Sequence, residues 1–356
     1  MLAGYTSLKP NSDRPLPSSF GVPVPRPGGR GIPVIIVTGT LGAGKTTLIR
    51  ALLDTPEGAG SAVIVNEFGE IGIDDVLLRA SSDATVLLGN GCLCCRQSSD
   101  MDATLRSLFI DRRRGAVPSF ARVLIETSGL ADPGPILQTF MTERGLHEMF
   151  SLQQVVAVVD AVNGAANLAA MPEAVRQVAL ADRIILTKTD LSPSPHVDAL
   201  MAVIGSINAA APAAIAGSDR AALDALIGGS LISGLEQRPI STPVSHSPGI
   251  RSFTLTFDAP VRWPSFALAM RTLASLRGPD LLRAKGLLAV EGLKGPAVVH
   301  YVQHLAHTRV ELNEWPDGPR RSRLVLITRN IERAAVTDLF AAIARLQPEA
   351  EGDISD

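Results

Sequence analysis

The sequence is poor in cysteine, in aromatic residues and in net charge. Only three of its 356 residues are cysteine, aromatic residues make up 4%, and the formal net charge is −2. Three cysteines within four positions cannot form a framework of disulfides, which favours a reducing compartment. A nearly neutral chain has no bulk charge with which to attract nucleic acid or an anionic membrane. We therefore expect neither as a partner.

Long apolar runs are absent as well. No run is long enough to cross a bilayer, and the N-terminus lacks the short apolar core of a secretory signal, so we expect a cytoplasmic protein. Hydrophobic residues nevertheless make up 46% of the chain, against 19% charged residues. This composition is typical of a globular protein with a large core, and the length suits two domains.

The chain divides into segments of different texture. The first 32 residues hold six prolines, five glycines and a single acid, Asp13, without hydrophobic periodicity. A flexible tail is the main interpretation, and an organelle-targeting peptide is the alternative. We predict a tail at 1–32, a larger domain at 33–230, a linker at 231–250, a smaller domain at 251–346 and a second short tail at 347–356.

Short apolar runs alternate with helical patterns in the larger segment. Buried strands are predicted at 33–39, 61–66, 84–89, 121–126, 153–160 and 183–188. Helices are predicted at 46–53 and 98–114. Strands that are apolar on both faces and alternate with helices indicate an α/β fold, with a parallel sheet covered by helices on both faces.

The pattern beyond residue 250 differs. It predicts an alternating strand at 251–257, an amphipathic helix at 263–277, strand-like stretches at 286–291, 297–312 and 323–328, and a helix at 331–346. This arrangement indicates a smaller α+β domain.

Residues 39–46, GTLGAGKT, match the phosphate-loop pattern G-x-x-x-x-G-K-[ST] between a predicted strand and a predicted helix. Backbone N–H groups of such a loop surround phosphate oxygens, the lysine reaches the β- and γ-phosphates, and the hydroxyl ligates Mg²⁺. The alternative is a glycine-rich turn with an incidental lysine. The expected binding residues are Gly39, Gly42, Ala43, Gly44, Lys45, Thr46 and Thr47.

The stretch VLIETSGLADP (123–133) follows as a second motif. Glu126 ends a buried strand, where an acid would hold the Mg²⁺ shell through water, and Gly129 could bond the γ-phosphate and so report its hydrolysis. The alternative for Glu126 is a carboxylate at a strand end in water.

The stretch ILTKTDL (185–191) resembles the guanine-reading N-K-x-D motif of GTPases. Asp190 would accept hydrogen bonds from guanine N1 and N2, and the stem of Lys188 would lie against the ring. Thr187 stands where asparagine is usual, which leaves the strength of guanine selection over adenine open.

All three cysteines lie in GNGCLCC (89–95), just after the third predicted strand, and VNEFGEIGIDD (65–75) follows the second. The carboxyl ends of parallel strands face one crevice, so both segments should lie near the phosphate site. Cys92, Cys94 and Cys95 could supply thiolates to Zn²⁺ or a similar ion, with Glu67 or Glu70 completing the set. The alternatives are a Cys92–Cys95 redox dithiol and inert packing.

In chain order these five motifs resemble the CobW-type family of P-loop GTPases. The resemblance continues through LLRAKG (281–286), WPDG (315–318) and SRLVLITR (322–329), and so covers about residues 33–346. It implies GTP hydrolysis with Mg²⁺, binding of a transition metal (zinc first, cobalt second) at the C-x-C-C motif, and delivery to a client metalloprotein. A nucleotide-dependent homodimer is a further expected partner. The chain lacks the histidine-rich run of many members and offers only His246 near the boundary.

The mechanism that we expect is a GTP-gated metal site. GTP and Mg²⁺ would order the glutamate-containing loop and the Gly129 turn, and Asp74, with Glu70 second, would position the attacking water. The motifs contain no arginine finger, so turnover should be slow without a partner. The competing hypotheses are a P-loop kinase of a small metabolite and a thiol-based metal or redox sensor with a structural nucleotide.

Other histidines and the tryptophans are weaker candidates. On a helix His300, His304 and His307 would share one face and could bind a metal ion, but the alternation of β-branched residues favours a strand. On a strand His300 and His304 share a face but lie about 13 Å apart, too far to share one ion. A partner surface or plain packing is preferred for these two and for His307. Trp263 and Trp315 are interpreted as core anchors, and His147 and His196 as surface residues, with approach to the segment at 65–75 as the alternative for His147.

Overall fold

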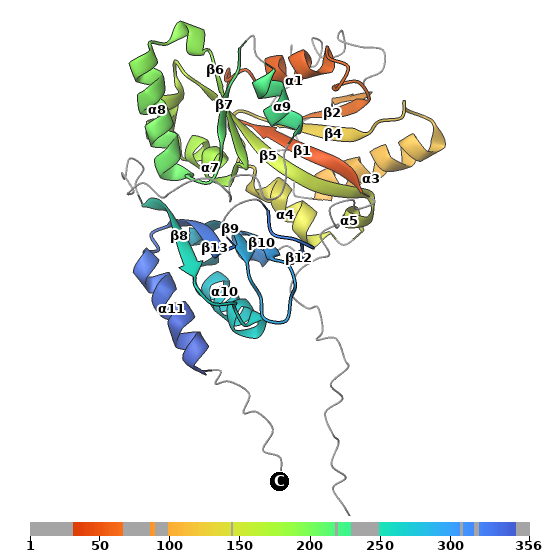
Figure 1. Cartoon of the computed structure of the whole chain (residues 1–356). Helices are drawn as coiled ribbons and strands as arrows, with labels where there is room; N and C mark the ends of the chain where they lie inside the picture. The colour runs from red at the N-terminus through yellow and green to blue at the C-terminus, as the bar shows by residue number, and fades with distance from the viewer. Residues whose placement is uncertain are drawn as a thin grey trace, which may run out of the picture.

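The computed structural model describes residues 31–66, 86–89, 99–143, 145–217, 220–228, 249–306, 309–316 and 320–346. These residues form two sheets, one of seven strands and one of six (Figure 1). The predicted tails at 1–32 and 347–356 and the linker at 231–250 fall almost entirely outside the described ranges, so the predicted boundaries stay predictions. No helix in the described ranges combines the length and the apolar character that crossing a membrane requires.

The first sheet is wholly parallel. Its strands are β1 (Ile32–Thr38), β2 (Ser61–Asn66), β3 (Val86–Gly89), β4 (Arg122–Thr127), β5 (Phe150–Asp160), β6 (Arg183–Thr187) and β7 (Ala213–Ile215). They lie in the order β3-β2-β4-β1-β5-β6-β7, and every neighbouring pair is parallel. The register places Val37 opposite Glu126 and Asp160 opposite Thr187, so these strands end at one edge of the sheet.

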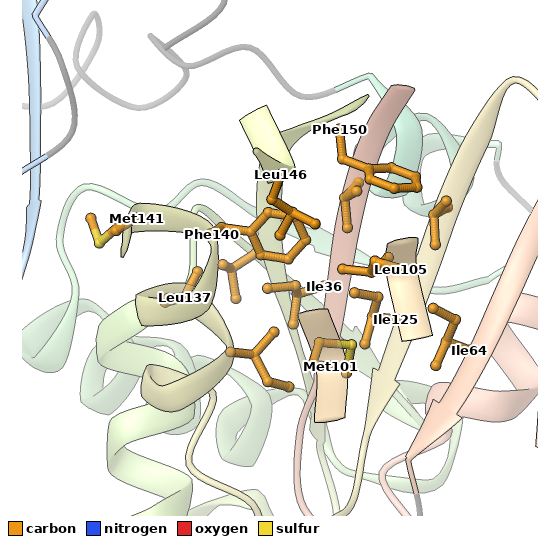
Figure 2. Close-up of a cluster of buried hydrophobic side chains, with 14 of the residues drawn as sticks. Ile36, Ile64, Met101, Leu105, Ile125, Leu137, Phe140, Met141, Leu146 and Phe150 are labelled. Atoms are coloured by element: carbon orange, nitrogen blue, oxygen red, sulfur yellow. The ribbon is translucent and has the colours of Figure 1, made fainter. Parts of the chain in front are cut away.

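Helices cover both faces of this sheet, as predicted. α1 (Lys45–Leu53) and α9 (Ala221–Ile227) lie on one face, where they pack against Ile35 and Val37. On the other face lie α3 (Ser99–Arg114), α4 (Gly134–Thr142), α5 (Leu146–Met149), α6 (Gly164–Ala170), α7 (Pro172–Leu180) and α8 (Ser194–Ile207). Figure 2 shows Leu105 from α3 and Phe140 from α4 gathered over Ile36. Alternate side chains of each strand point to opposite faces of the sheet. Because helices cover both faces, the side chains on both faces are apolar.

The second sheet is antiparallel and carries its two helices on one face. Its elements are β8 (Ile250–Phe257), α10 (Trp263–Arg277), β9 (Leu281–Leu288), β10 (Ala297–Val302), β11 (Leu305–Ala306), β12 (Val310–Glu311), β13 (Ser322–Arg329) and α11 (Arg333–Leu346). The opposite face meets α4, α7 and α8 of the first unit (Figure 1). The predicted fold class, a P-loop-type parallel sheet with a smaller α+β domain, is therefore confirmed.

Two strand predictions in this domain are wrong. The strand expected at 286–291 is instead β9, Leu281–Leu288. Its start was missed because Arg283 and Lys285 interrupt the run of apolar residues, although both side chains are buried. The strand expected over 297–312 is broken, because the chain turns at Gln303, which has a φ of 54°. His300 lies on β10, but His304 lies in that turn and not on a shared strand face. His307 lies outside the described residues.

The tryptophans pack as predicted, and His196 is exposed. Trp263 stacks on Phe266 with a centroid separation of 5.6 Å, within the second-domain core. Trp315 packs against the smaller cluster of Leu287, Val298 and Val310 on the opposite sheet face. The side chain of His147 is not among those described.

Candidate functional site

The loop after β1 has the backbone that its glycines predict. Gly39, Gly42 and Gly44 have φ angles of 145°, 73° and 94°, in the region that side-chain-bearing residues avoid. A Cβ on Gly39 would also lie 2.2 Å from the carbonyl oxygen of Val158. Gly44 directly precedes α1, so the loop feeds into the positive end of that helix. This arrangement can cradle an anion such as a phosphate group.

The lysine and the threonine of the loop occupy defined positions. Lys45 is buried, and its Nζ donates to the carbonyl oxygens of Gly39 at 3.0 Å and Thr40 at 3.1 Å. Thr46 Oγ1 donates to Glu126 Oε1 at 2.7 Å, and Glu126 is buried at the end of β4. A hydroxyl and a carboxylate in contact are hard oxygen donors of the kind that Mg²⁺ prefers. The two residues predicted for Mg²⁺ therefore fit that ion.

The turn that carries Gly129 packs directly on the phosphate loop. A Cβ on Gly129 would lie 2.4 Å from the backbone nitrogen of Leu41, so only glycine permits this approach. Ala131 N–H donates to Ser128 O at 3.0 Å and closes the turn. Thr127 Oγ1 donates to Thr38 Oγ1 at 2.9 Å and ties the ends of β4 and β1 together. A ligand seated on the loop would therefore lie beside Gly129.

The predicted base motif contacts the same loop. Thr187 is buried, and its hydroxyl donates to Ala43 O at 2.7 Å. Lys188 has a φ of 57°, and its Nζ donates to Gly42 O at 2.8 Å and Asp160 Oδ2 at 2.6 Å. Asp190 follows in a 3-10 turn, η2 (Thr189–Leu191), and is exposed. Thr187 is thus hydrogen-bonded to the phosphate loop, whereas the side chain of Asp190 is exposed and available to a ligand.

Sequence reasoning missed Asp160. Its Oδ1 accepts the Val162 N–H at 2.7 Å and the Asn163 N–H at 3.3 Å, while Oδ2 accepts Lys188. Burial alone would raise the pKa of this carboxyl, but the Lys188 ammonium and these N–H donors together hold the pKa below its ordinary value. The available signal was an acid at the end of a buried strand, the same signal that identified Glu126.

Sequence reasoning also missed the residues that support the Gly129 turn. Gln177 on α7 is buried, and its Nε2 donates to Gly129 O at 3.2 Å and Ala131 O at 3.0 Å. Arg176 forms an ion pair with Asp132, whose Oδ1 also accepts the Gly134 N–H at 2.8 Å. No local pattern marks a buried glutamine of this kind, because its partners lie more than 45 residues away.

The predicted metal-binding and water-positioning residues fall outside the described ranges. These are Glu67, Glu70, Asp74, Cys92, Cys94 and Cys95. Among the residues that the structure does describe, no group of three His, Cys, Asp or Glu side chains could hold a metal ion. The strands that lead into both segments are described, however. The register places Val65 of β2 opposite both Glu126 and Gly89, so both segments leave the sheet at the edge that carries Glu126.

Comparison with known proteins accounts for both domains. Residues 33–214 match the nucleotide-binding domain described as CobW/HypB/UreG, and residues 250–344 match the cobalamin synthesis protein CobW C-terminal domain. The chain belongs to the CobW/HypB/UreG family. The resemblance drawn from the five motifs is therefore confirmed.

Individual members of the family align over nearly the whole chain. The zinc chaperone YjiA of Escherichia coli is 34% identical over 320 residues, which cover 88% of this chain and 99% of that protein. The zinc chaperone CobW of Pseudomonas aeruginosa is 33% identical over 348 residues, which cover 86% of this chain and 90% of that protein. The crystal structure of Zn(II)-bound YjiA GTPase superposes with a TM-score of 0.66 at 29% identity, covering 88% of this chain and 99% of that one.

Proposed function

We propose that the chain is a GTP-hydrolysing metallochaperone of the cytoplasm, which binds zinc, or cobalt second, and delivers it to a client metalloprotein. One observation carries the nucleotide part of this proposal. The phosphate loop, the Thr46–Glu126 pair and the base motif meet at one sheet edge, joined by the hydrogen bond from Thr187 to Ala43 O at 2.7 Å. The names of its family relatives, zinc chaperone and GTPase, support the metal and the reaction.

The loop residues would hold the triphosphate. Backbone N–H groups from Gly39 to Thr47 face phosphate oxygens, and Lys45 exchanges its two carbonyl partners for β- and γ-phosphate oxygens. Thr46 and Glu126, the latter through water, hold Mg²⁺, which when bound neutralises charge on the phosphates. The Gly129 N–H lies beside the loop, where it bonds the γ-phosphate and is released after hydrolysis.

The base motif would select guanine. The exposed Asp190 carboxylate accepts hydrogen bonds from N1–H and the N2 amino group of guanine, whereas adenine has no hydrogen on N1 and no amino group at C2. Lys188 is held in place at its ammonium end by Asp160 and Gly42 O, so its aliphatic stem is free to lie against the base. The hydroxyl of Thr187 is engaged with the loop, which gives this residue a positioning role.

The metal step would use the segments that leave the sheet beside Glu126. Cys92, Cys94 and Cys95, with Glu67, bind the cargo ion while GTP holds these segments in one arrangement. Asp74, with Glu70 second, positions the attacking water. Hydrolysis relaxes the segments and releases the metal to the client, and turnover without a partner is slow. A homodimer that forms with one nucleotide and not the other is a further expected partner.

Phosphate release is the experiment that tests the reaction. Wild-type protein with Mg²⁺ should release phosphate from GTP at a measurable rate and from ATP much more slowly. Lys45→Ala should abolish release, whereas Lys294→Ala, at an exposed lysine of the second domain, should not. Transfer of the phosphate to an acceptor other than water would instead indicate the kinase. Binding of GTP without hydrolysis, together with reversible oxidation of the cysteines, would indicate the sensor.

A further inference from the structure

Helix α7 contacts the Gly129 turn with side chains in its second half. Gln177 donates both of its described hydrogen bonds to carbonyl oxygens of that turn, and only 1% of its surface is exposed. Arg176, the preceding residue, pairs with Asp132 at the end of the turn. Because both contacts are made by one rigid helix, a shift of the turn has to be accommodated by α7 or by breaking these bonds.

The C-terminal end of the same helix contacts the other domain. The carbonyl oxygen of Leu180, the last residue of α7, accepts a hydrogen bond from Arg283 on β9. Asp182, two residues further on, accepts hydrogen bonds from Arg283 and, at 2.9 Å, from Lys285 of the same strand. Its second oxygen accepts the Val155 N–H at 2.9 Å. We call Asp182, Arg283 and Lys285 the interdomain ion cluster.

The interdomain ion cluster is buried, so its ion pairs are costly to separate. All three side chains are at most 8% exposed. Burial alone would raise the pKa of Asp182, but the charges of Arg283 and Lys285 hold that pKa far below its ordinary value. Separating a buried carboxylate from its cations leaves uncompensated charge in a low dielectric, so the contact should hold or yield as a unit.

We propose that α7 transmits the presence of the γ-phosphate from Gly129 to the C-terminal domain, with Gln177 as the positioning residue at one end and the interdomain ion cluster as the contact at the other. The proposal rests on the proposed function, because it assumes that GTP binds beside Gly129. By holding the carbonyl oxygens on either side of Leu130, Gln177 restricts the orientations open to the Gly129 N–H. A turn that reorders on hydrolysis would pull on α7 and therefore on β9.

A second contact offers a competing route. Helix α4 begins at Gly134, directly after the turn, and Gln138 Nε2 donates to Gln303 Oε1 of the C-terminal domain at 2.6 Å. This bond is partly buried, whereas the bond from Gln177 to Gly129 O is buried, and it ends on the turn between β10 and β11. The experiment therefore includes Gln138→Leu, which removes this hydrogen bond of the α4 route and leaves the α7 contacts intact.

The chain also offers a matched control. Gln154 on β5 is 1% exposed, and its Nε2 donates to the carbonyl oxygens of Ala225 at 3.1 Å and Leu226 at 2.6 Å. Gln154→Leu thus removes two hydrogen bonds from a buried glutamine amide to backbone carbonyls, as Gln177→Leu does. Its partners belong to α9, on the sheet face away from the C-terminal domain. A general loss of stability should affect both variants alike.

The test uses the full chain with Mg²⁺ and either GDP or a non-hydrolysable GTP analogue. Hydrogen exchange of the backbone amides of β9 (Leu281–Leu288) is measured with each nucleotide. The affinities of the protein for GDP and for the GTP analogue are measured as well. Wild-type protein should show different exchange in β9 with the two nucleotides. Gln177→Leu should lose that difference, and its preference for the GTP analogue over GDP should fall about tenfold with GDP affinity unchanged. Gln154→Leu and Gln138→Leu should keep both properties.

Three results would overturn the proposal. Exchange in β9 that does not depend on the nucleotide in wild-type protein would remove the signal itself. A difference that survives Gln177→Leu would exclude α7 as the route, and loss of the difference in Gln138→Leu alone would assign the route to α4. If one of these results is obtained and wild-type protein still hydrolyses GTP, only the α7 proposal fails and the proposed function stands. If wild-type protein does not bind GTP, both the α7 proposal and the proposed function fail.

Discussion

Thr46 and Glu126 are 80 residues apart in the chain, and the threonine hydroxyl lies 2.7 Å from the carboxylate of Glu126. The contact follows from the register of the parallel sheet, in which β4 lies beside β1 and ends level with it. A hydroxyl from the first turn of a helix and a buried strand-end carboxylate converge where the phosphate loop ends. This pair is therefore the expected Mg²⁺ site, and its two residues can be tested separately.

Loss of the hydroxyl should slow hydrolysis. Thr46→Ala is expected to lower the Mg²⁺-dependent rate of GTP hydrolysis about 100-fold, because one direct ligand of the ion is removed. Thr46→Ser keeps the hydroxyl and should retain most of the rate. Phosphate release at saturating GTP and a range of Mg²⁺ concentrations measures both. Equal rates for the alanine and serine variants would contradict the assignment.

Base selection should change in Asp190→Asn. An amide offers one acceptor and one donor, which suits the N1–H and the C2 carbonyl of xanthine better than the two donors of guanine. GTP affinity should fall at least about tenfold, and XTP affinity should rise. Competition against a fluorescent GDP analogue measures both constants. If GTP, XTP and ATP keep their wild-type affinities, Asp190 does not contact the base.

Crowding at Gly129 predicts a selective defect. A methyl group in Gly129→Ala would lie 2.4 Å from the Leu41 nitrogen, so the turn has to move away from the loop. We expect weaker binding of a GTP analogue with GDP binding almost unchanged, since in the proposed site only the γ-phosphate would contact this turn. The matched control is Gly205→Ala within α8, where an added Cβ meets nothing within 4 Å. That variant should bind both nucleotides normally and gain about 0.5–1 kcal/mol of stability.

Removal of the shared carboxylate should destabilise the domain interface. Asp182→Asn leaves Arg283 and Lys285 buried without their anion, and should lower the free energy of unfolding by about 3–5 kcal/mol. Lys285→Met leaves the Asp182–Arg283 pair intact, and should change the free energy by less than about 1 kcal/mol. Urea unfolding at neutral pH compares them. Equal losses in the two variants would show that the carboxylate is not the centre of the cluster.

The same carboxylate predicts a loss of stability in acid. The pKa of Asp182 in the folded protein lies below its value in the unfolded chain, which is about 3.9. The unfolded chain therefore takes up the proton first as the pH falls. The stabilisation is fully present above about pH 4 and is lost below it. In Asp182→Asn the free energy of unfolding should fall less steeply below about pH 4 than in wild-type protein.

Local patterns in the sequence predicted the phosphate loop, Glu126, the base motif and the parallel sheet, because each depends on spacing within a few residues. Asp160 ends a buried strand as Glu126 does, so its position could have been predicted in the same way, although its partner Lys188 lies 28 residues away. Gln177 and Asp182 could not, because they act through partners 48 and 101 residues away. The bounds of β9 were wrong for a related reason. From the sequence alone, Arg283 and Lys285 are expected at the surface, because charged residues are seldom buried without a partner. The carboxylate that allows their burial belongs to the neighbouring domain.

In the function that we propose, the nucleotide controls a zinc site built on the three cysteines. The most direct measurement is a Zn²⁺ titration against a chromophoric chelator, with Mg²⁺ and either GDP or a non-hydrolysable GTP analogue, on wild-type protein and on Cys94→Ser. Zinc should bind at least about tenfold more tightly with the GTP analogue than with GDP, corresponding to a coupling of about 1.4 kcal/mol, and Cys94→Ser should lose that difference. Equal zinc affinity with the two nucleotides in wild-type protein would contradict it.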